Sequence, residues 1–366
     1  MTRQQHAGPP RATAKAASVV LCGHILRPEF LDIVSISTAL VVRRVCIVRF
    51  SASRLALPYI LPHVAVLLAT HNGSPFLNEQ LASIAAQSGV TVDVCCSDDA
   101  STDTTVAMLA EWRQRWPKGD FTIAAGPNRG FAENFRALIR TAQDDADYFA
   151  FCDQDDVWDS DKLETAVAAL SSHPDSVAAL YCARSRLIDT SGNPFGLSPL
   201  FRRRPSFGNA LVQSLAAGNT MVFNRAALAV LRAAAERTAF PMHDWWSYLL
   251  LTGTGGAVIY DPVPRLGYRQ HAGNVIGGPI GLRDRPRRLI ELASGRFARQ
   301  IDRNLAALEE CRDMLTNEAR GTLETFAGIR RAAALPATVR LARSTIRRQT
   351  INGDVALYFA AALGRL

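Results

Sequence analysis

Three carboxylates in the middle of the chain come directly after a short apolar run. Residues 149–152 have the length and aromatic content of a buried strand, and Asp153, Asp155 and Asp156 follow it. Because like charges at this spacing repel one another, a fold keeps them together where a cation normally sits. The carboxylates of Asp153 and Asp155 are ligands that Mg²⁺ or Mn²⁺ prefers. The string predicts a divalent metal site, and the alternative is a solvated acidic turn before the helix that starts near Ser160.

The elements around this string alternate between strands and helices. This alternation predicts an α/β fold with a mostly parallel sheet and helices on both faces, in which ligands bind at the carboxyl ends of the strands. Apolar runs of strand length cover residues 63–69, 90–96, 121–125 and 148–152, and helix patterns cover residues 76–87, 106–110 and 131–139. Besides the acidic string, the polar residues predicted at the strand ends are Thr70, His71, Asp98, Asp99, Asn128 and Gly130.

The next part of the chain continues this pattern less regularly. Further strands are predicted at residues 177–183, 217–224 and 266–270, and a helix at 225–237. The stretch 189–208 is rich in Gly and Pro and is interpreted as a long loop. Its arginines, Arg202, Arg203 and Arg204, are either solvated or clamp a phosphorylated acceptor.

Asp244 lies beside two tryptophans at the start of an apolar helix pattern. Low exposure at such a position raises the pKa of a carboxyl group and suits it to act as a general base. A helix N-cap explains an aspartate here equally well. Asp244 is therefore a candidate catalytic base with a structural alternative.

Length and composition describe a globular protein. The 366 residues are 48% apolar and 20% charged, which allows one large or two modest domains. The 7 cysteines show no disulfide or zinc spacing, which indicates thiols in a reducing compartment, the cytoplasm. No window holds the roughly 18 uninterrupted apolar residues of a membrane span. Residues 1–62 are rich in Arg and Ala, and we expect a basic, poorly ordered extension.

The net charge of +8 is unevenly distributed along the chain. Residues 1–63 hold 8 basic and 2 acidic side chains, residues 64–280 hold 17 and 22, and residues 281–366 hold 16 and 9. The acidic middle carries the motifs, and this argues against a catalytic groove for nucleic acid.

Residues 281–366 have the pattern of a basic helical region. On a single helix through residues 335–347, apolar side chains share one face and arginines share the other. Such a helix either lies peripherally on an anionic membrane surface or packs on the catalytic domain. The apolar residues are Leu335, Val339, Ala342 and Ile346, and the arginines are Arg340, Arg343 and Arg347.

Six segments of the chain together resemble the inverting glycosyltransferases of family 2, which have the GT-A fold. The bacterial rhamnosyltransferases of cell-surface polysaccharide assembly are the subgroup they resemble most. The segments follow the order of that family, and residues 63–280 are therefore predicted to be the glycosyltransferase domain. They cover residues 67–73 with 79–81, 98–103, 128–130 with 134–135, 152–158, 243–245, and 268–271 with Asn274.

The resemblance implies a nucleotide-sugar site at the strand ends. Thr70 and His71 line the nucleotide pocket in this interpretation, and Asp98 or Asp99 hydrogen-bonds the pyrimidine base. Asn128 and Gly130 belong to the same binding site.

The resemblance also implies a metal site and a catalytic base. Asp153 and Asp155, together with His271, hold a Mg²⁺ or Mn²⁺ ion that bridges the diphosphate of the nucleotide sugar. Arg269 contacts the diphosphate. Asp244 takes the proton from the acceptor hydroxyl.

The activity implied is inverting transfer of a sugar from a nucleoside-diphosphate donor to a hydroxyl of a cell-surface glycan or a lipid-linked acceptor. The subgroup implies L-rhamnose carried by deoxythymidine diphosphate (dTDP). The alternative is a non-catalytic member of the fold that binds membranes or glycans through its basic ends. A nucleotidyltransferase needs a Gly-rich phosphate loop after the first strand, and residues 70–73 do not form one.

Overall fold

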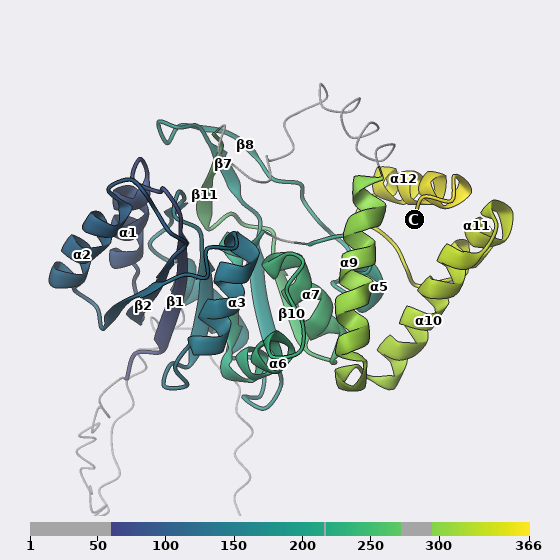
Figure 1. Cartoon of the computed structure of the whole chain (residues 1–366), viewed down its shortest axis with the longest axis horizontal. Coiled ribbons are helices and arrows are strands. Elements are labelled where there is room, and N and C mark those ends of the chain that lie inside the picture. Colours follow the sequence, from purple (N-terminus) through teal and green to yellow (C-terminus); the bar gives the residue numbers. More distant parts are fainter. Residues whose placement is uncertain (1–59, 216, 272–294) are drawn as a thin grey trace, which may run out of the picture. The chain divides into compact units, whose positions relative to one another are not determined.

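The computed structural model describes residues 60–215, 217–271 and 295–366 (Figure 1). The predicted N-terminal extension, residues 1–62, lies outside the described residues except for Ile60, Leu61 and Pro62. Asn274 and residues 281–294 also lie outside them, so the predicted boundary near residue 280 stays a prediction. In the described part of the chain, no helix is long and apolar enough to cross a membrane.

A seven-stranded sheet forms the centre of the molecule, in the order β10-β6-β9-β4-β1-β2-β3. Every neighbouring pair is parallel except the two pairs that β9 makes. The predicted α/β fold with a mostly parallel sheet is confirmed. The strands are β1 (His63–Thr70), β2 (Thr91–Asp98), β3 (Phe121–Ala125), β4 (Tyr148–Cys152), β6 (Ala179–Ala183), β9 (Val222–Asn224) and β10 (Ala257–Asp261).

The two faces of this sheet bury two separate hydrophobic clusters. In β1, Ala65 and Leu67 belong to one cluster, and Val66 and Leu68 to the other. Successive side chains of a strand point to opposite faces, so a continuous apolar run is what a strand covered on both faces requires. This explains why the runs at β1 and β4 do not alternate with polar residues.

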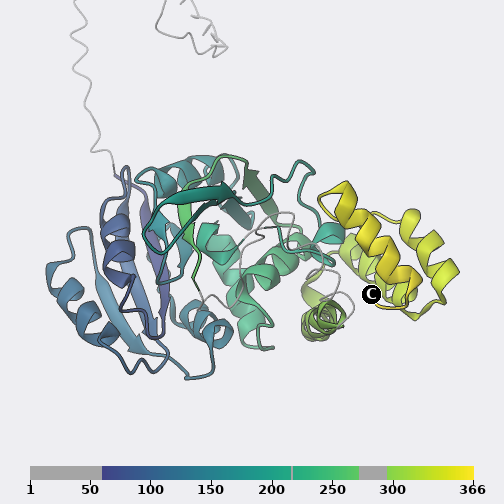
Figure 2. The ribbon, with the colours of Figure 1, turned by 90° about the horizontal axis from the view of Figure 1, so that it is seen from above.

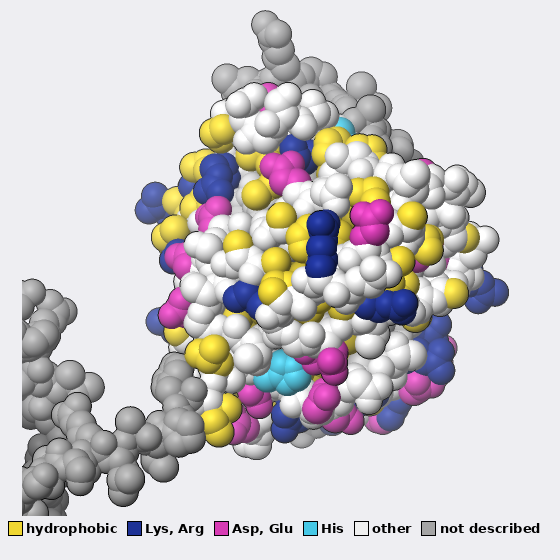
Figure 3. All heavy atoms as spheres, turned by 90° about the vertical axis from the view of Figure 1, so that its left-hand side faces the viewer, with side chains coloured by type: hydrophobic (Ala, Val, Ile, Leu, Met, Phe, Trp, Pro, Cys, Tyr) yellow, Lys and Arg dark blue, Asp and Glu magenta, His cyan; other side chains and the backbone are white. Residues whose placement is uncertain are grey.

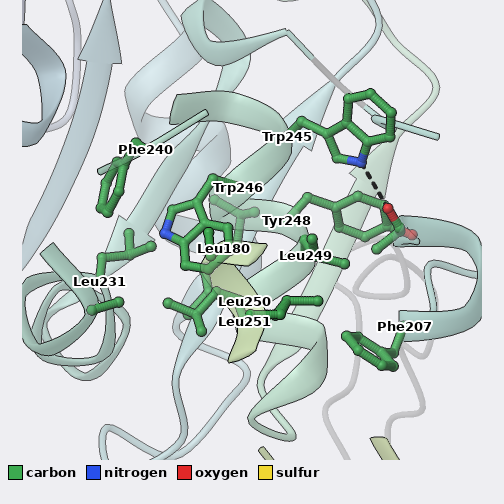
Figure 4. Close-up of a cluster of buried hydrophobic side chains, with 14 of the residues drawn as sticks. Leu180, Phe207, Leu231, Phe240, Trp245, Trp246, Tyr248, Leu249, Leu250 and Leu251 are labelled. Carbon is green, nitrogen blue, oxygen red and sulfur yellow. Dashed lines mark hydrogen bonds between the residues drawn. The ribbon is translucent and has the colours of Figure 1, made fainter. Parts of the chain in front are cut away.

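Helices cover both faces, and Figure 1 shows α1 and α2 on one side of β1 and β2 and α3 on the other. One cluster is completed by α1 (Leu77–Ala85), α2 (Thr105–Arg115) and α4 (Lys162–Leu170). The other is completed by α3 (Phe131–Thr141), α6 (Arg225–Ala235) and α7 (His243–Gly253). Figure 4 shows the second cluster around α7, where the Trp245 Nε1 donates a hydrogen bond of 2.7 Å to the Ala210 carbonyl.

A smaller four-stranded sheet corrects the prediction of one long loop at 189–208. It contains β5 (Val157–Trp158), β11 (Leu266–Arg269), β7 (Arg186–Ile188) and β8 (Pro194–Leu197), and α5 (Phe207–Ala210) ends the stretch. The prediction was wrong because Gly and Pro do not exclude an edge strand. β8 pairs only with β7 and begins with Pro194, a position where a missing N–H costs no ladder bond.

The predicted strand 217–224 is shorter than expected. Its first part is a 3₁₀ turn, η1 (Gly218–Thr220), and only β9 is extended. The turn brings the Asn219 side chain to the acidic string. The strand β10 was not predicted at all, although Val258, Ile259 and Tyr260 have strand propensity.

The C-terminal helices pack on the same core as α7. Ile301, Leu308, Phe326 and Leu341 are buried in the cluster that contains α7. The Thr316 N–H donates to the Gly253 carbonyl at the end of α7 at 2.9 Å. These helices therefore pack on the catalytic domain, but of the apolar face predicted at residues 335–347 only Ile346 is buried, whereas Leu335 and Val339 are exposed. The helices are α9 (Arg296–Glu310), η3 (Arg312–Met314), α10 (Asn317–Arg331), α11 (Ala334–Ala342) and α12 (Ile351–Ala362).

We expect Leu250→Ala to lower the free energy of unfolding by about 2–5 kcal/mol, because Leu250 is 0% exposed in the α7 cluster. The matched control Leu197→Ala removes a leucine that is 48% exposed on β8, and its effect should stay within about 0.5 kcal/mol. Urea denaturation followed by circular dichroism measures both. Equal losses would contradict the assignment of α7 to the core.

Candidate active site

The parallel register of β1 and β2 brings the first pair of predicted site residues together. Thr70 lies opposite Asp98. The Thr70 hydroxyl donates a hydrogen bond of 2.8 Å to Oδ1 of Asp98, and the Ser101 N–H donates to Oδ2 at 2.9 Å. Both Thr70 and Asp98 are buried. The end of β2 is therefore pinned to the end of β1.

Asp99 organises the loop that follows β3. Its two carboxylate oxygens accept the backbone N–H groups of Asn128 at 2.6 Å and Gly130 at 2.7 Å. Gly130 has φ of 87°, a conformation in which a side chain is strained. Asn128 and Gly130 are exposed, so the loop presents them at the surface while Asp99, which is buried, holds their backbone.

Backbone strain concentrates at these strand ends. Among the described residues, the non-glycine residues with positive φ are Asn72 at 49°, Ala100 at 64° and Asn128 at 54°. They follow β1, β2 and β3, respectively. Left-handed backbone at a non-glycine residue persists only where the surroundings enforce it, and it clusters at binding sites.

The turn after β1 is hydrogen-bonded to the acidic string. The His71 N–H donates to the Gln154 side-chain oxygen at 2.7 Å, and the Gln154 amide donates to the His71 carbonyl at 2.9 Å. The His71 ring lies 2.7 Å from the Asp99 carbonyl through Nδ1. His71 thus connects the loop of Asp99 with the string that contains Asp153.

The acidic string is partly enclosed at the end of β4. Asp156 is 1% exposed, and it accepts hydrogen bonds from the Asn219 amide at 2.5 Å and from the Arg269 N–H at 3.1 Å. Burial and the neighbouring carboxylates raise the pKa of Asp153 and of Asp156. The site therefore favours any bound cation that offsets the repulsion.

The residues predicted to bind a metal fit a divalent ion by their chemistry. The imidazole Nε2 of His271 lies 2.7 Å from Oδ2 of Asp155, although 116 residues separate the two in sequence. Asp153 is close enough to Asp155 for the two charges to raise the pKa of Asp153. Two carboxylates and an imidazole nitrogen suit Mn²⁺, and the carboxylates suit Mg²⁺. In the described part of the chain, no three such side chains are gathered in ion-binding geometry.

Arg269 is fully buried and is hydrogen-bonded to the acidic string. Its guanidinium donates to the carbonyls of Asp155 at 2.9 Å and Thr190 at 3.0 Å, and to the Glu79 carboxylate at 2.5 Å. Its side chain is 0% exposed. The predicted contact of Arg269 with the diphosphate stays a prediction, whereas its contact with the backbone of Asp155 is part of the structure.

Asp244 lies in the first turn of α7 and is 8% exposed. Its Oδ1 accepts the Trp245 N–H at 2.6 Å. Burial raises the pKa of Asp244 to about 6, against the effect of hydrogen bonds from Trp245 and Gly218. Its charge contributes to the raised pKa of Asp153. The candidate base Asp244 therefore lies close enough to the candidate metal ligand Asp153 for its charge to act on it.

Two buried residues near this site were not predicted to matter. The ammonium group of Lys162 lies 3.4 Å from the centre of the Trp158 ring, and burial lowers its pKa to about 7. The charge of Asp156 acts on it in the opposite direction. In the sequence, Lys162 looked like an ordinary residue of a helix start, and no local pattern distinguishes a buried lysine there.

His243 is the second unpredicted residue. Its ring is stacked on Phe135, with 3.8 Å between the ring centres, and its edge faces Phe151. Neither ring nitrogen has a hydrogen-bond partner among the described residues. Burial lowers the pKa of His243 from 6.5 to about 3, so the imidazole is neutral in the folded protein at neutral pH.

Comparison with known proteins agrees with this geometry. Residues 65–232 match the model of the family described as glycosyl transferase family 2. The dTDP-rhamnosyl transferase RfbG of Shigella flexneri is 27% identical over 252 residues, which cover 66% of this chain and 85% of that protein.

Two solved structures are also similar to the chain. TarS of S. aureus, residues 1–349 in complex with UDP-GlcNAc, is 14% identical, with a TM-score of 0.48 over 82% of this chain and 90% of that one. The mannosyltransferase PcManGT of Pyrobaculum calidifontis, in complex with GDP-Man and Mn²⁺, is 19% identical, with a TM-score of 0.46 over 84% of this chain and 87% of that one.

Residues 65–232 form a family 2 glycosyltransferase domain, and the protein is a glycosyltransferase. The resemblance to this family and to rhamnosyltransferases is confirmed. The matched range contains the strand ends and the acidic string, whereas Asp244, Arg269 and His271 lie beyond it. Their roles therefore rest on the geometry of this chain.

We expect His243→Phe to make the protein more resistant to acid. Between pH 6.5 and about 3 the unfolded chain binds a proton at His243 that the folded chain does not, so stability falls as the pH falls. Phenylalanine keeps the stacking and removes this cost. Compared with the wild type, the variant should gain about 1 kcal/mol of unfolding free energy for each pH unit below about 6. Urea titrations at several pH values measure it, and a pH-independent difference would contradict it.

Proposed function

We propose that this glycosyltransferase is inverting and transfers a sugar from a nucleoside diphosphate to a hydroxyl of a cell-surface glycan or a lipid-linked acceptor. The observation that carries the proposal is the position of Asp244. A buried carboxylate with a pKa of about 6 shares an electrostatic site with the acidic string after β4. A direct displacement needs a base for the attacking hydroxyl and, close to it, a site that stabilises the leaving group.

The sugar we propose is L-rhamnose, donated by dTDP-rhamnose. Support comes from the relative named dTDP-rhamnosyl transferase, whose alignment covers 85% of that protein. No residue of the described chain is assigned to the sugar itself.

The nucleotide is proposed to bind over the ends of β1, β2 and β3. Thr70 and Asp98 form one wall through their mutual hydrogen bond, and Asp99 positions the exposed loop of Asn128 and Gly130. His71 is exposed beside both, so its ring is accessible for stacking. These residues supply polar contacts for a base and a ribose.

The diphosphate is proposed to lie over the acidic string. Asp153, Asp155 and His271 would hold a Mg²⁺ or Mn²⁺ ion there, and the bound ion supplies positive charge beside the departing nucleoside diphosphate. The Arg269 guanidinium donates a hydrogen bond to the Asp155 carbonyl and so keeps the backbone of Asp155 in place. Gln154 holds the string against the turn of His71.

Asp244 is proposed to accept the proton of the acceptor hydroxyl as that oxygen attacks the anomeric carbon of the sugar. With a pKa of about 6, its carboxyl group is mostly ionised at neutral pH and still basic enough to accept a proton. The bond to the nucleoside diphosphate breaks as the new bond forms, which inverts the anomeric configuration. No second carboxylate is required as a nucleophile.

Two substitutions separate these roles. Asp153→Asn should abolish the Mn²⁺-dependent binding of dTDP, because it removes a proposed ligand. Asp244→Asn should keep that binding within a few fold and lower turnover by about 10²–10⁴ fold, the usual contribution of a general base. Calorimetric titration with dTDP and with uridine diphosphate, each with and without Mn²⁺, measures binding, and release of nucleoside diphosphate measures turnover.

The matched control for both substitutions is Asp175→Asn, which changes an exposed aspartate after α4 and should alter neither quantity. Equal loss of nucleotide binding in both site variants would contradict the division of roles. Binding of neither nucleotide by the wild-type protein would contradict the proposed donor site.

The pH dependence of turnover is an independent test of Asp244 as the base. Because a base acts in its ionised form, turnover with saturating substrates should be constant above about pH 7 and fall about tenfold per pH unit below the pKa of about 6. A profile measured from pH 8 downwards, with denaturation monitored in parallel, checks this. Turnover that stays constant to pH 5 while the protein remains folded would exclude Asp244 as the base.

A further inference from the structure

The helix α12 exposes a continuous apolar stripe. Ile351, Val355, Phe359 and Leu363 follow one another at intervals of four residues, so they lie on one side of the helix. Their exposed fractions are 76%, 62%, 55% and 54%, respectively. The opposite side of α12 carries Leu357, Ala360 and Ala361, which are buried in the core. The exposed stripe is therefore additional to the apolar residues that the fold uses.

The neighbouring helix α11 also exposes apolar side chains. Leu335 is 76% exposed and Val339 is 42% exposed, whereas Ala337 and Leu341 of the same helix are buried. The two helices pack against each other, and Figure 2 shows them side by side at the C-terminal end of the chain. Exposed apolar side chains gathered on neighbouring helices mark an interaction site.

The charge carried by these two helices and the segments beside them is mainly positive. Residues 331–366 contain six arginines and a single acid, Asp354. The carboxylate of Asp354 is already paired with Arg203 at 2.6 Å. Arg331, Arg340, Arg343, Arg347 and Arg365 are all exposed. By contrast, the face over α1 and α2 in Figure 3 mixes basic, acidic and hydrophobic side chains.

We propose that the exposed face of α11 and α12 docks on an anionic lipid surface. The apolar stripe would enter the boundary between headgroups and acyl chains, and the arginines would meet the lipid phosphates. The long stems of arginine allow the guanidinium groups to reach the headgroups while their carbons stay in the apolar layer.

A second copy of the chain fits this surface less well. In a symmetric dimer the same patch meets itself, which would place the arginines of one copy opposite those of the other. Asp354, the only acid within residues 331–366, is engaged within its own chain, so it offers no compensation. An anionic bilayer satisfies both the apolar stripe and the positive charge.

The structure also corrects the prediction of a membrane-binding helix at residues 335–347. The single amphipathic helix predicted through residues 335–347 does not exist, because α11 ends at Ala342 and Ile346 is 1% exposed in the core. The apolar stripe of α12 was not predicted. The basic character of residues 281–366 was predicted.

Vesicle binding tests the proposal on the full chain. The wild type should co-sediment with vesicles of phosphatidylcholine and phosphatidylglycerol, and much less with phosphatidylcholine alone or at high salt. The double variant Val355→Ser/Phe359→Ser should lose about tenfold or more in partitioning, because it removes two apolar anchors. The matched control Phe195→Ser/Val263→Ser changes residues that are 51% and 48% exposed elsewhere, and should bind as the wild type does.

Three outcomes would overturn the proposal. The first is undiminished vesicle binding by Val355→Ser/Phe359→Ser, which retains residues 1–59 and would assign binding to another part of the chain. The second is equal loss in the control variant. The third is a wild-type dimer, measured by light scattering, that dissociates in the α12 variant, because the stripe would then be a contact between copies.

This surface would bring the enzyme to a lipid-linked acceptor, and that part rests on the proposed function. The two are tested separately, because the α12 variant should bind dTDP with Mn²⁺ as the wild type does. Failure of nucleotide binding in every variant, with vesicle binding intact, would reject the proposed donor while leaving the lipid-binding surface in place.

Discussion

Repulsion among the carboxylates that follow β4 is the constraint on which the site depends. Burial and the neighbouring carboxylates raise the pKa of Asp153 and Asp156, which means that negative charge on these groups is costly in the folded chain until a cation offsets it. Much of the surrounding structure restrains this charge. Asn219 and the backbone of Arg269 donate to Asp156, and Gln154 fastens the string to the turn after β1. The same repulsion makes the site favourable for a cation and for the diphosphate that a cation carries.

The parallel sheet supplies the geometry for this chemistry. Strands β1, β2 and β4 end at one edge, which places Thr70, Asp98 and the acidic string next to one another. Two further side chains, His271 and Asp244, come to that edge from later parts of the chain. The segment after β11 brings His271 within 2.7 Å of Asp155, and α7 carries Asp244, whose charge acts on Asp153. The residues proposed to bind the nucleotide, to hold the metal ion and to act as the base thus come from separate elements of the fold.

Local sequence patterns predicted the strands of this scaffold better than the contacts between them. β3 and β4 have the predicted bounds because their apolar runs are bordered by polar turns. The pairing of Asp155 with His271 spans 116 residues, so only a family resemblance, and no local pattern, brought them together. The burial of Arg269 and Lys162 was not predictable, since long cationic side chains are usually exposed. The stripe on α12 was missed because the apolar signal of its buried side overlaps with it.

We propose that Asp155 and His271 together bind the metal ion that the donor site uses. Electron paramagnetic resonance of free Mn²⁺, titrated with protein in the presence of dTDP, measures this directly. We expect the wild type to remove about one equivalent of Mn²⁺ from solution, and Asp155→Asn and His271→Phe each to weaken this binding by about tenfold or more. Mn²⁺ bound equally well by all three proteins would contradict the claim.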